Sequence, residues 1–171
     1  IVYSVTKESD YGTNLVRGEW RDSGLAKVFR EVTQARTRGK TVIADFESYN
    51  PSGGEPAAFM GGAIMDEEGE YLGAMVFQMP INKINYIMQA TAGMGETGQC
   101  FIVGKDHLMR SDSRFSKEST ILKREVDEET VDFALAGKSG YETIIGEDGH
   151  MVESAYLPFK WGGLEWALLC E

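Results

Sequence analysis

The sequence predicts an α+β protein built from two modules, each an antiparallel sheet flanked by helices. Residues 56–79 contain two apolar runs on either side of an acidic, glycine-containing turn, which is typical of a β-hairpin. The second half of the chain repeats a similar order of strands and helices, which suggests two copies of one fold. A chain of 171 residues is long enough for one domain or for two small ones.

The hairpin joins residues 57–65 to residues 71–79. Both strands are apolar on both faces, so we expect both to lie in the middle of a sheet that is covered on each side. Gly61 and Gly62 interrupt the first strand without a side chain to pack. We expect a hollow for a ligand beside them, although two glycines that only accommodate a neighbouring helix would give the same pattern.

Before the hairpin, the pattern predicts a strand, a helix and another strand. Residues 1–6 and 41–46 have strand-like patterns. Asp22 or Ser23 can cap a helix over residues 24–36, whose apolar residues recur at helical spacing on one face.

After the hairpin, residues 81–88 have helical spacing, and the glycines of residues 92–98 resemble a joint. We place the domain boundary there, which gives modules 1–92 and 93–171. The second module is expected to contain strands at 99–103 and 107–110, an amphipathic region at 121–135 ended by Gly137, and strands at 141–145, 150–157 and 164–170.

Composition narrows the function. A net charge of −10 argues against nucleic acid or an anionic membrane surface as a partner. The sequence contains no apolar run long enough to span a bilayer. It lacks an initiator Met and a signal-peptide pattern, so we expect a fragment of a longer protein, with a processed mature protein as the alternative. The common nucleophile, zinc-protease and P-loop motifs are absent, so an enzyme is the least favoured class and no cofactor is expected.

Five segments together resemble one family. They are KESDYGTNL, DSGLAKVF, FESYNPSGGEPAAFMGGAIMD, GAMVFQMPINKINYIM and GETGQCFIVGKDHLMRSDSRF. In combination they resemble the extracytoplasmic Cache-type sensor domains, which are tandem PAS-like domains, of bacterial methyl-accepting chemotaxis proteins. Similar domains occur in membrane-bound histidine kinases and nucleotide cyclases.

The resemblance implies a double-Cache arrangement, with a membrane-distal module at 1–92 that is truncated at its start and a membrane-proximal module at 93–171. It implies a periplasmic location for this part of an inner-membrane receptor, and a homodimer in the full-length protein. A long N-terminal helix, which would supply the dimer interface, is missing from this sequence.

In such domains a small ligand binds in the distal module, and the resemblance implies a set of matching positions here. The candidate ligand-binding residues are Tyr11, Trp20, Asp45, Glu47, Tyr49 and Phe59. Asp45, Glu47 and Tyr49 alternate, so all three would share one face of a strand and suit a cationic or amine-bearing ligand. A solvated strand end would give the same pattern. The spacing of Arg17 and Trp20 departs from the family's amino-acid motif, so an α-amino-acid ligand is not implied.

Arg110 and Arg114 form a secondary candidate, because two arginines can clasp an anion. The alternative, which we favour, is that Asp112 pairs with an arginine and fixes the loop. His107 and His150 lack ligand-spaced partners, so no metal site is expected.

Cys100 and Cys170 would lie on neighbouring strands of a PAS-type sheet. A disulfide is open to them in an oxidising periplasm, but two buried free thiols are the favoured expectation.

Three classes of function remain: a ligand-sensing domain, a purely structural dimerisation module, and an enzyme. We favour the chemoreceptor sensor that binds a small molecule and transmits a conformational signal across the membrane. The sensor domain of a histidine kinase or nucleotide cyclase, or a dimerisation module without a ligand, is the alternative.

Overall fold

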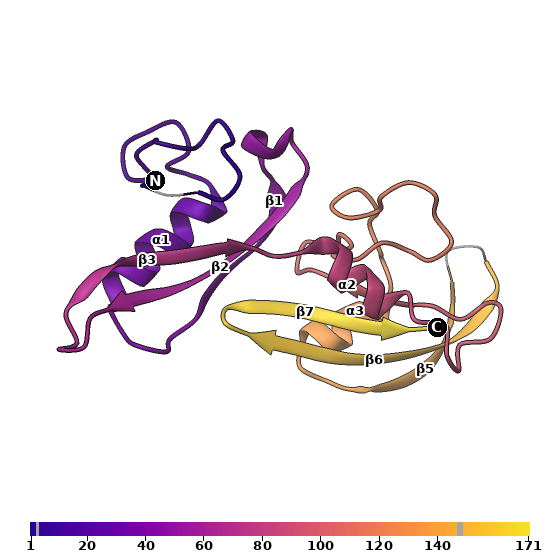
Figure 1. The fold of residues 1–171 in the computed structure, drawn as a ribbon. Helices are drawn as coiled ribbons and strands as arrows, with labels where there is room; N and C mark the ends of the chain where they lie inside the picture. Colours follow the sequence, from indigo (N-terminus) through magenta and orange to yellow (C-terminus); the bar gives the residue numbers. More distant parts are fainter. Residues whose placement is uncertain (3, 147–148) are drawn as a thin grey trace. The chain divides into compact units, whose positions relative to one another are not determined.

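The computed structural model describes residues 1–2, 4–146 and 149–171 (Figure 1). The chain divides into two compact units, Ile1–Met79 and Pro80–Glu171. The division falls before the helix at 81–88, so that helix lies in the second unit, whereas the sequence placed the boundary at the glycine-rich joint. The strand expected over residues 1–6 does not form in residues 1–2 and 4–6, and residue 3 lies outside the described part.

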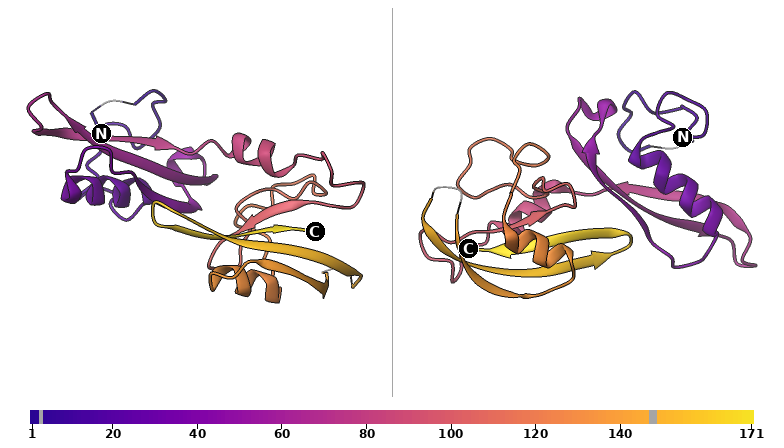
Figure 2. Two further views of the ribbon diagram at one scale, coloured as in Figure 1. Left: turned by 90° about the horizontal axis from the view of Figure 1, so that it is seen from below. Right: turned by 180° about the vertical axis from the view of Figure 1, so that it is seen from behind.

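The first unit is a three-stranded antiparallel sheet with a helix on one face (Figure 2). Its elements are α1 (Gly24–Ala35), β1 (Val42–Ser48), the 3-10 helix Asn50–Ser52, β2 (Pro56–Met65) and β3 (Tyr71–Gln78). The strand order is β1-β2-β3, so the predicted hairpin is confirmed and β2 is its central strand. The expectation that both hairpin strands are central is wrong for β3, which lies at the edge of this sheet and exposes Met75 and Phe77.

The predicted helix begins as the sequence indicated. The Ser23 side chain accepts a hydrogen bond from the backbone N–H of Ala26 at 3.2 Å, which caps the first turn of α1. At the other end Arg36 adopts the left-handed conformation that commonly terminates a helix. Val28 and Val32 are buried against the sheet, in a core that includes Val42.

Gly61 is the point of closest approach between α1 and the sheet. A Cβ atom at Gly61 would lie 2.7 Å from Val28 Cγ1 and 2.8 Å from the carbonyl oxygen of Met75. The expected ligand hollow between these glycines and the helix is therefore absent, because Val28 fills the space. A groove of about 650 Å³ lies next to Gly61 and Gly62, and its apolar lining includes Met60, Met75 and Phe77. The pairing of β2 with β3 puts these three residues on the face of the sheet opposite α1.

This close approach predicts the effect of adding one methyl group to β2. Gly61→Ala should destabilise the first unit by about 1–3 kcal/mol, because Val28 or the β3 backbone must move. Gly73→Ala on β3 is the matched control, since a Cβ there meets no atom within 4 Å and its unfolding free energy should change by less than about 0.5 kcal/mol. Equal urea midpoints for the two variants would contradict the packing described here.

In its described residues, the second unit has a four-stranded antiparallel sheet and two helices. Its elements are α2 (Ile81–Met88), β4 (Cys100–Val103), α3 (Glu129–Leu135), β5 (Gly140–Ile145), β6 (Met151–Trp161) and β7 (Leu164–Cys170). The sheet order is β4-β7-β6-β5, and α3 packs against β6 and β7. The four strands match the sequence-based expectations at 99–103 and in the last third of the chain.

Residues 107–126 differ from the sequence-based expectation. The strand expected at 107–110 is reduced to two isolated bridges, from Met109 to Val103 and from Leu108 to Glu125. The helical region expected from residue 121 begins only at Glu129. The backbone N–H of Met109 donates to Arg124, and the N–H of Leu122 donates to Met109. These hydrogen bonds between distant segments satisfy the backbone groups that a local helix or strand would otherwise use.

Cys100 and Cys170 form a disulfide, so the expectation of two free thiols is wrong. Cys100 begins β4 and Cys170 ends β7, and the antiparallel register pairs them directly, with their Cα atoms 4.1 Å apart. The bond joins residues 70 positions apart, so it links the first and the last strand of this unit in chain order, which are neighbours in the sheet.

Removing this bond should destabilise the second unit selectively. Closing a loop of this length restricts the unfolded chain, so Cys100→Ser/Cys170→Ser should lose about 2–5 kcal/mol of unfolding free energy. Differential scanning calorimetry with and without a reductant provides the measurement, and the double variant should become insensitive to the reductant. A wild-type transition that does not move on reduction would contradict this expectation.

Candidate functional site

Three aromatic rings from separate segments of the first unit meet near the beginning of α1. The Trp20 and Tyr49 ring centroids lie 6.5 Å apart, and Tyr49 meets Phe59 edge-on at 4.9 Å. We call these three residues the aromatic cluster. Tyr49 and Phe59 are only 2% and 3% exposed, so their rings are core anchors and Trp20 is the outermost of the three.

Asp10 joins the N-terminal loop to this cluster. The Tyr49 hydroxyl donates a hydrogen bond of 2.6 Å to Asp10 Oδ2, and both residues are buried. Burial raises the pKa of the Tyr49 hydroxyl well above its ordinary value, and the hydrogen bond to Asp10 and the negative charge of that carboxylate add to the shift. Tyr49 therefore stays a neutral donor. Sequence reasoning did not single out Asp10, because nothing local indicates that it reaches a tyrosine 39 positions away.

A β-bulge changes the row of polar side chains expected on β1. The register with β2 shifts between Ala44 and Glu47, so two residues of β1 lie opposite one residue of β2 and β1 carries one extra residue. Glu47 and Ala44 consequently both face Gly24 on α1, and the Glu47 carboxylate accepts the Gly24 backbone N–H at 2.6 Å. Asp45 lies in the bulge, where its carboxylate accepts the N–H of Phe46 at 2.7 Å. The simple alternation of Asp45, Glu47 and Tyr49 is therefore wrong.

Trp20 carries the most informative polar atom of the cluster. Its indole Nε1 is buried and has no hydrogen-bond partner among the described residues. A buried donor of this kind usually bonds to water or to a ligand. Tyr11, by contrast, is exposed, with the Lys7 ammonium 5.6 Å from its ring centroid. The structure thus brings together Trp20, Glu47, Tyr49 and Phe59 of the predicted site.

The two candidate anion-binding arginines are engaged with their own loops. Arg110 is only 3% exposed, and its guanidinium packs over Gly104. The guanidinium bonds to the two oxygens of the Asp106 carboxylate at 2.9 and 3.0 Å. Partial burial raises the pKa of Asp106, but the Arg110 hydrogen bond and charge outweigh that effect, so the pKa lies below its usual value. Arg114 instead donates to the carbonyls of Gly95, Glu96 and Gly98. The two guanidiniums therefore hold separate internal partners.

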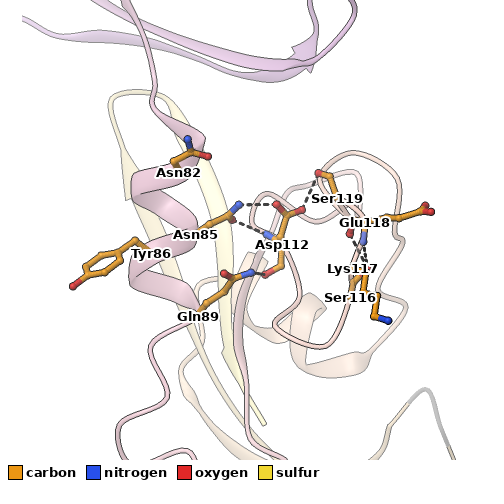
Figure 3. Close-up of a pocket in the computed structure, with 9 residues that line it drawn as sticks. All are labelled: Asn82, Asn85, Tyr86, Gln89, Asp112, Ser116, Lys117, Glu118 and Ser119. Carbon is orange, nitrogen blue, oxygen red and sulfur yellow. Dashed lines mark hydrogen bonds between the residues drawn. The ribbon is translucent and has the colours of Figure 1, made fainter.

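Asp112 fixes the loop, as expected, but through Asn85 rather than through an arginine (Figure 3). Asn85 on α2 donates to Asp112 Oδ2 at 2.6 Å and accepts the Asp112 backbone N–H at 2.8 Å. The other carboxylate oxygen accepts from Ser119 Oγ and from the Thr120 N–H. This network forms one side of a polar pocket of about 400 Å³ and attaches α2 to the loop around Asp112.

Loss of the Asp112 carboxylate should therefore loosen this attachment. Asp112→Ala removes three accepted hydrogen bonds, and we expect it to reduce the free energy of unfolding by about 2–4 kcal/mol. Glu118→Ala, at an exposed position lining the same pocket, is the control and should have little effect. Chemical denaturation would decide the matter, and indistinguishable midpoints for the two variants would argue against the network.

His107 has two polar neighbours in the second unit. His107 Nε2 lies 3.3 Å from Asp132, and its Nδ1 lies 3.1 Å from the carbonyl of Val126. Within the described ranges, no group of three His, Cys, Asp or Glu side chains is arranged to hold a metal ion. None of the helices in the same ranges is both long and apolar enough to cross a bilayer.

Comparisons with known proteins identify the fold. No protein-family model matches the chain, and the search of curated proteins gives no significant match. Among solved structures, the periplasmic sensory domain of the Campylobacter jejuni chemoreceptor Tlp1 is similar, with a TM-score of 0.61 and 19% identity over 84% of this chain and 53% of that one.

Two further structures extend the comparison. The ligand-binding domain of the Pseudomonas aeruginosa PAO1 chemoreceptor PctC, in complex with GABA, gives a TM-score of 0.58 at 16% identity, over 98% of this chain and 65% of that one. The extracellular domain of the proposed histidine kinase mmHK1S-Z3 gives 0.58 at 19% identity, over 86% of this chain and 53% of that one. The chain thus spans less than two thirds of each of these structures, and its fold is that of chemoreceptor and histidine-kinase sensory domains.

Proposed function

We propose that the chain is an extracytoplasmic ligand-sensing domain of a bacterial chemoreceptor, not an enzyme. The observation that carries the proposal is the similarity of nearly the whole chain to sensory and ligand-binding domains of chemoreceptors. The neighbouring structures include complexes with GABA, L-arginine and L-leucine, which supports a small molecule as the ligand class.

The two units are proposed to be tandem PAS-like modules in a double-Cache arrangement, distal and proximal to the membrane. Internal similarity supports this. In the first unit α1 is followed by the antiparallel strands β1-β2-β3, and in the second α3 is followed by β5-β6-β7. The second unit adds β4 alongside its last strand, β7. The corresponding position in the first unit is the outer edge of β3, where the described residues place no further strand.

The ligand is proposed to bind at the aromatic cluster of the first unit. Trp20 Nε1 would donate to an acceptor on the ligand, because it is buried and lacks a partner among the described residues. Asp10 and Glu47 supply carboxylates near the same rings, which suits a ligand that also carries an amine. Tyr49 and Phe59 would form the apolar base of the site, with Tyr11 and Asp45 as outer members.

Ligand binding is proposed to shift the packing of α1 against the sheet of the first unit. The full-length receptor is proposed to be a homodimer, and the rest of its chain would transmit that shift across the membrane. A histidine kinase or nucleotide cyclase is the alternative output. The similarity to the mmHK1S-Z3 extracellular domain supports the kinase, and the same sensing chemistry would serve both.

A thermal-shift screen with amines, GABA, amino acids, carboxylates and nucleobases tests the proposal. A ligand present at 100 times its dissociation constant should stabilise the folded protein by about 2.7 kcal/mol. Trp20→Phe and Glu47→Gln should weaken the effect of any hit by about tenfold in affinity, because each removes one polar contact. Asp45→Ala should have a smaller effect, since Asp45 lies in the bulge.

The exposed substitution Glu70→Gln in the β2–β3 turn is a charge-matched control and should leave hits unchanged. Hits that survive Trp20→Phe and Glu47→Gln at full strength would place the ligand elsewhere. The absence of any hit, together with a melting temperature that rises with protein concentration, would favour the dimerisation module instead.

A further inference from the structure

The sheet of the second unit packs one face against α3 and exposes a row of large apolar side chains on the other. The left view of Figure 2 shows α3, in orange, on one side of this sheet, where the Tyr156 ring of β6 lies 5.7 Å from that of Phe133. Because side chains alternate along a strand, the odd-numbered residues of β6 point away from α3. The register of β5 with β6 places Tyr141 opposite Ala155, so the odd-numbered residues of β5 lie on the same face.

Six large apolar side chains of β5 and β6 stand on this face. Their exposed fractions range from 39% at Phe159 to 77% at Met151. Together they expose on the order of 700 Å², which exceeds the roughly 300–600 Å² of the largest patch on a typical monomer. A patch of this size marks a surface that another molecule covers. We call it the outer face, and its members are Tyr141, Ile145, Met151, Leu157, Phe159 and Trp161.

The outer face is held in place by its neighbours and is almost uncharged. The Phe159 ring stacks at 5.8 Å on the ring of Trp166, a buried residue of β7. Thr143 and Glu153 pair across β5 and β6, and the Thr143 hydroxyl donates to the Glu153 carboxylate at 2.6 Å. Glu153 is the one charged side chain among the odd-numbered residues of these two described strands, and it already has this hydrogen bond.

The chemistry of the outer face indicates what kind of partner fits it. The whole chain carries a net charge of −10, but this face is nearly neutral, so a strongly charged partner gains little by contacting it. The partner needs a flat, apolar and almost uncharged surface of similar area, and the same face of a second copy has these properties. A standard interface buries about 800 Å² on each partner, which the exposed apolar area and a polar rim supply together.

We propose that two copies of this chain associate through the outer face, with their second-unit sheets packed face to face about a two-fold axis. Sheets that pack in this way lie about 10 Å apart, with their strands about 30° from alignment. Tyr141 and Leu157 lie at the centre of the contact, and Glu153 stays at the rim, where water reaches its carboxylate. The inference deepens the proposed function, because it assigns a surface to the proposed homodimer, and it requires no ligand.

Sedimentation equilibrium on the whole oxidised chain tests this interface. The wild type should show a reversible equilibrium between monomer and dimer. Tyr141→Glu and Leu157→Glu should each raise the dissociation constant of the dimer at least about tenfold. Each substitution occurs twice in a two-fold interface and places a carboxylate without a partner in an apolar contact. A wild-type chain that stays monomeric up to about 1 mM would overturn the proposal.

A matched control lies on the first unit. Phe77→Glu makes the same kind of change at an aromatic side chain that is 58% exposed on β3, and it should leave the dissociation constant of the dimer unchanged. Tyr141 is 76% exposed, so Tyr141→Glu should keep the circular dichroism spectrum of the wild type. A dimer that resists both outer-face substitutions, or that Phe77→Glu disrupts instead, would overturn the proposal.

The thermal-shift screen separates this interface from the proposed ligand site. Hits that persist in Tyr141→Glu while its dimer dissociates support both the outer face and the sensing function. A dimer that Tyr141→Glu leaves unchanged, in a chain that still gives hits, would overturn this inference and leave the proposed function intact. A dimer that Tyr141→Glu disrupts, in a chain that gives no hit, supports the interface and counts against sensing.

Discussion

The hydrogen bond between Tyr49 and Asp10 is the interaction on which the first unit's site depends. It joins the N-terminal loop to the end of β1 inside the core, where an unsatisfied hydroxyl or carboxylate would be costly. With the loop held there, Trp20 lies beside Tyr49 and its indole N–H is buried without a partner among the described residues. The bond therefore holds together a region of this unit in which aromatic rings, carboxylates and the unpartnered Trp20 indole N–H lie close to one another.

The two units differ in how closely a helix approaches the sheet. In each, a helix covers one face of an antiparallel meander, but at β2 a glycine allows the helix to approach closely, whereas the second unit keeps a cavity beside its helix start. The first unit thus excludes a ligand from the space between α1 and Gly61. The second unit also contains a disulfide that joins β4 to β7.

Much of the fold was readable from local patterns. The hairpin, the helix capped by Ser23 and the last three strands were predicted because each follows from periodicity, turn residues or a cap within a few positions. Residues 107–126 were mispredicted because their backbone hydrogen bonds join distant segments. Of the site, Trp20, Glu47, Tyr49 and Phe59 were named in advance from a resemblance, whereas Asp10 was not singled out.

The sequence by itself determined most of the strands and helices, since hydrophobic period and capping act over a few residues, although not the conformation of residues 107–126. Only the tertiary structure decided which side chains meet. The bulge after Ala44 turned Glu47 toward α1, Asn85 took the place of an arginine at Asp112, and the β4–β7 register brought Cys100 to Cys170. Each of these depends on pairing between residues far apart in the chain, and a single-residue shift in such pairing reverses which face a side chain occupies.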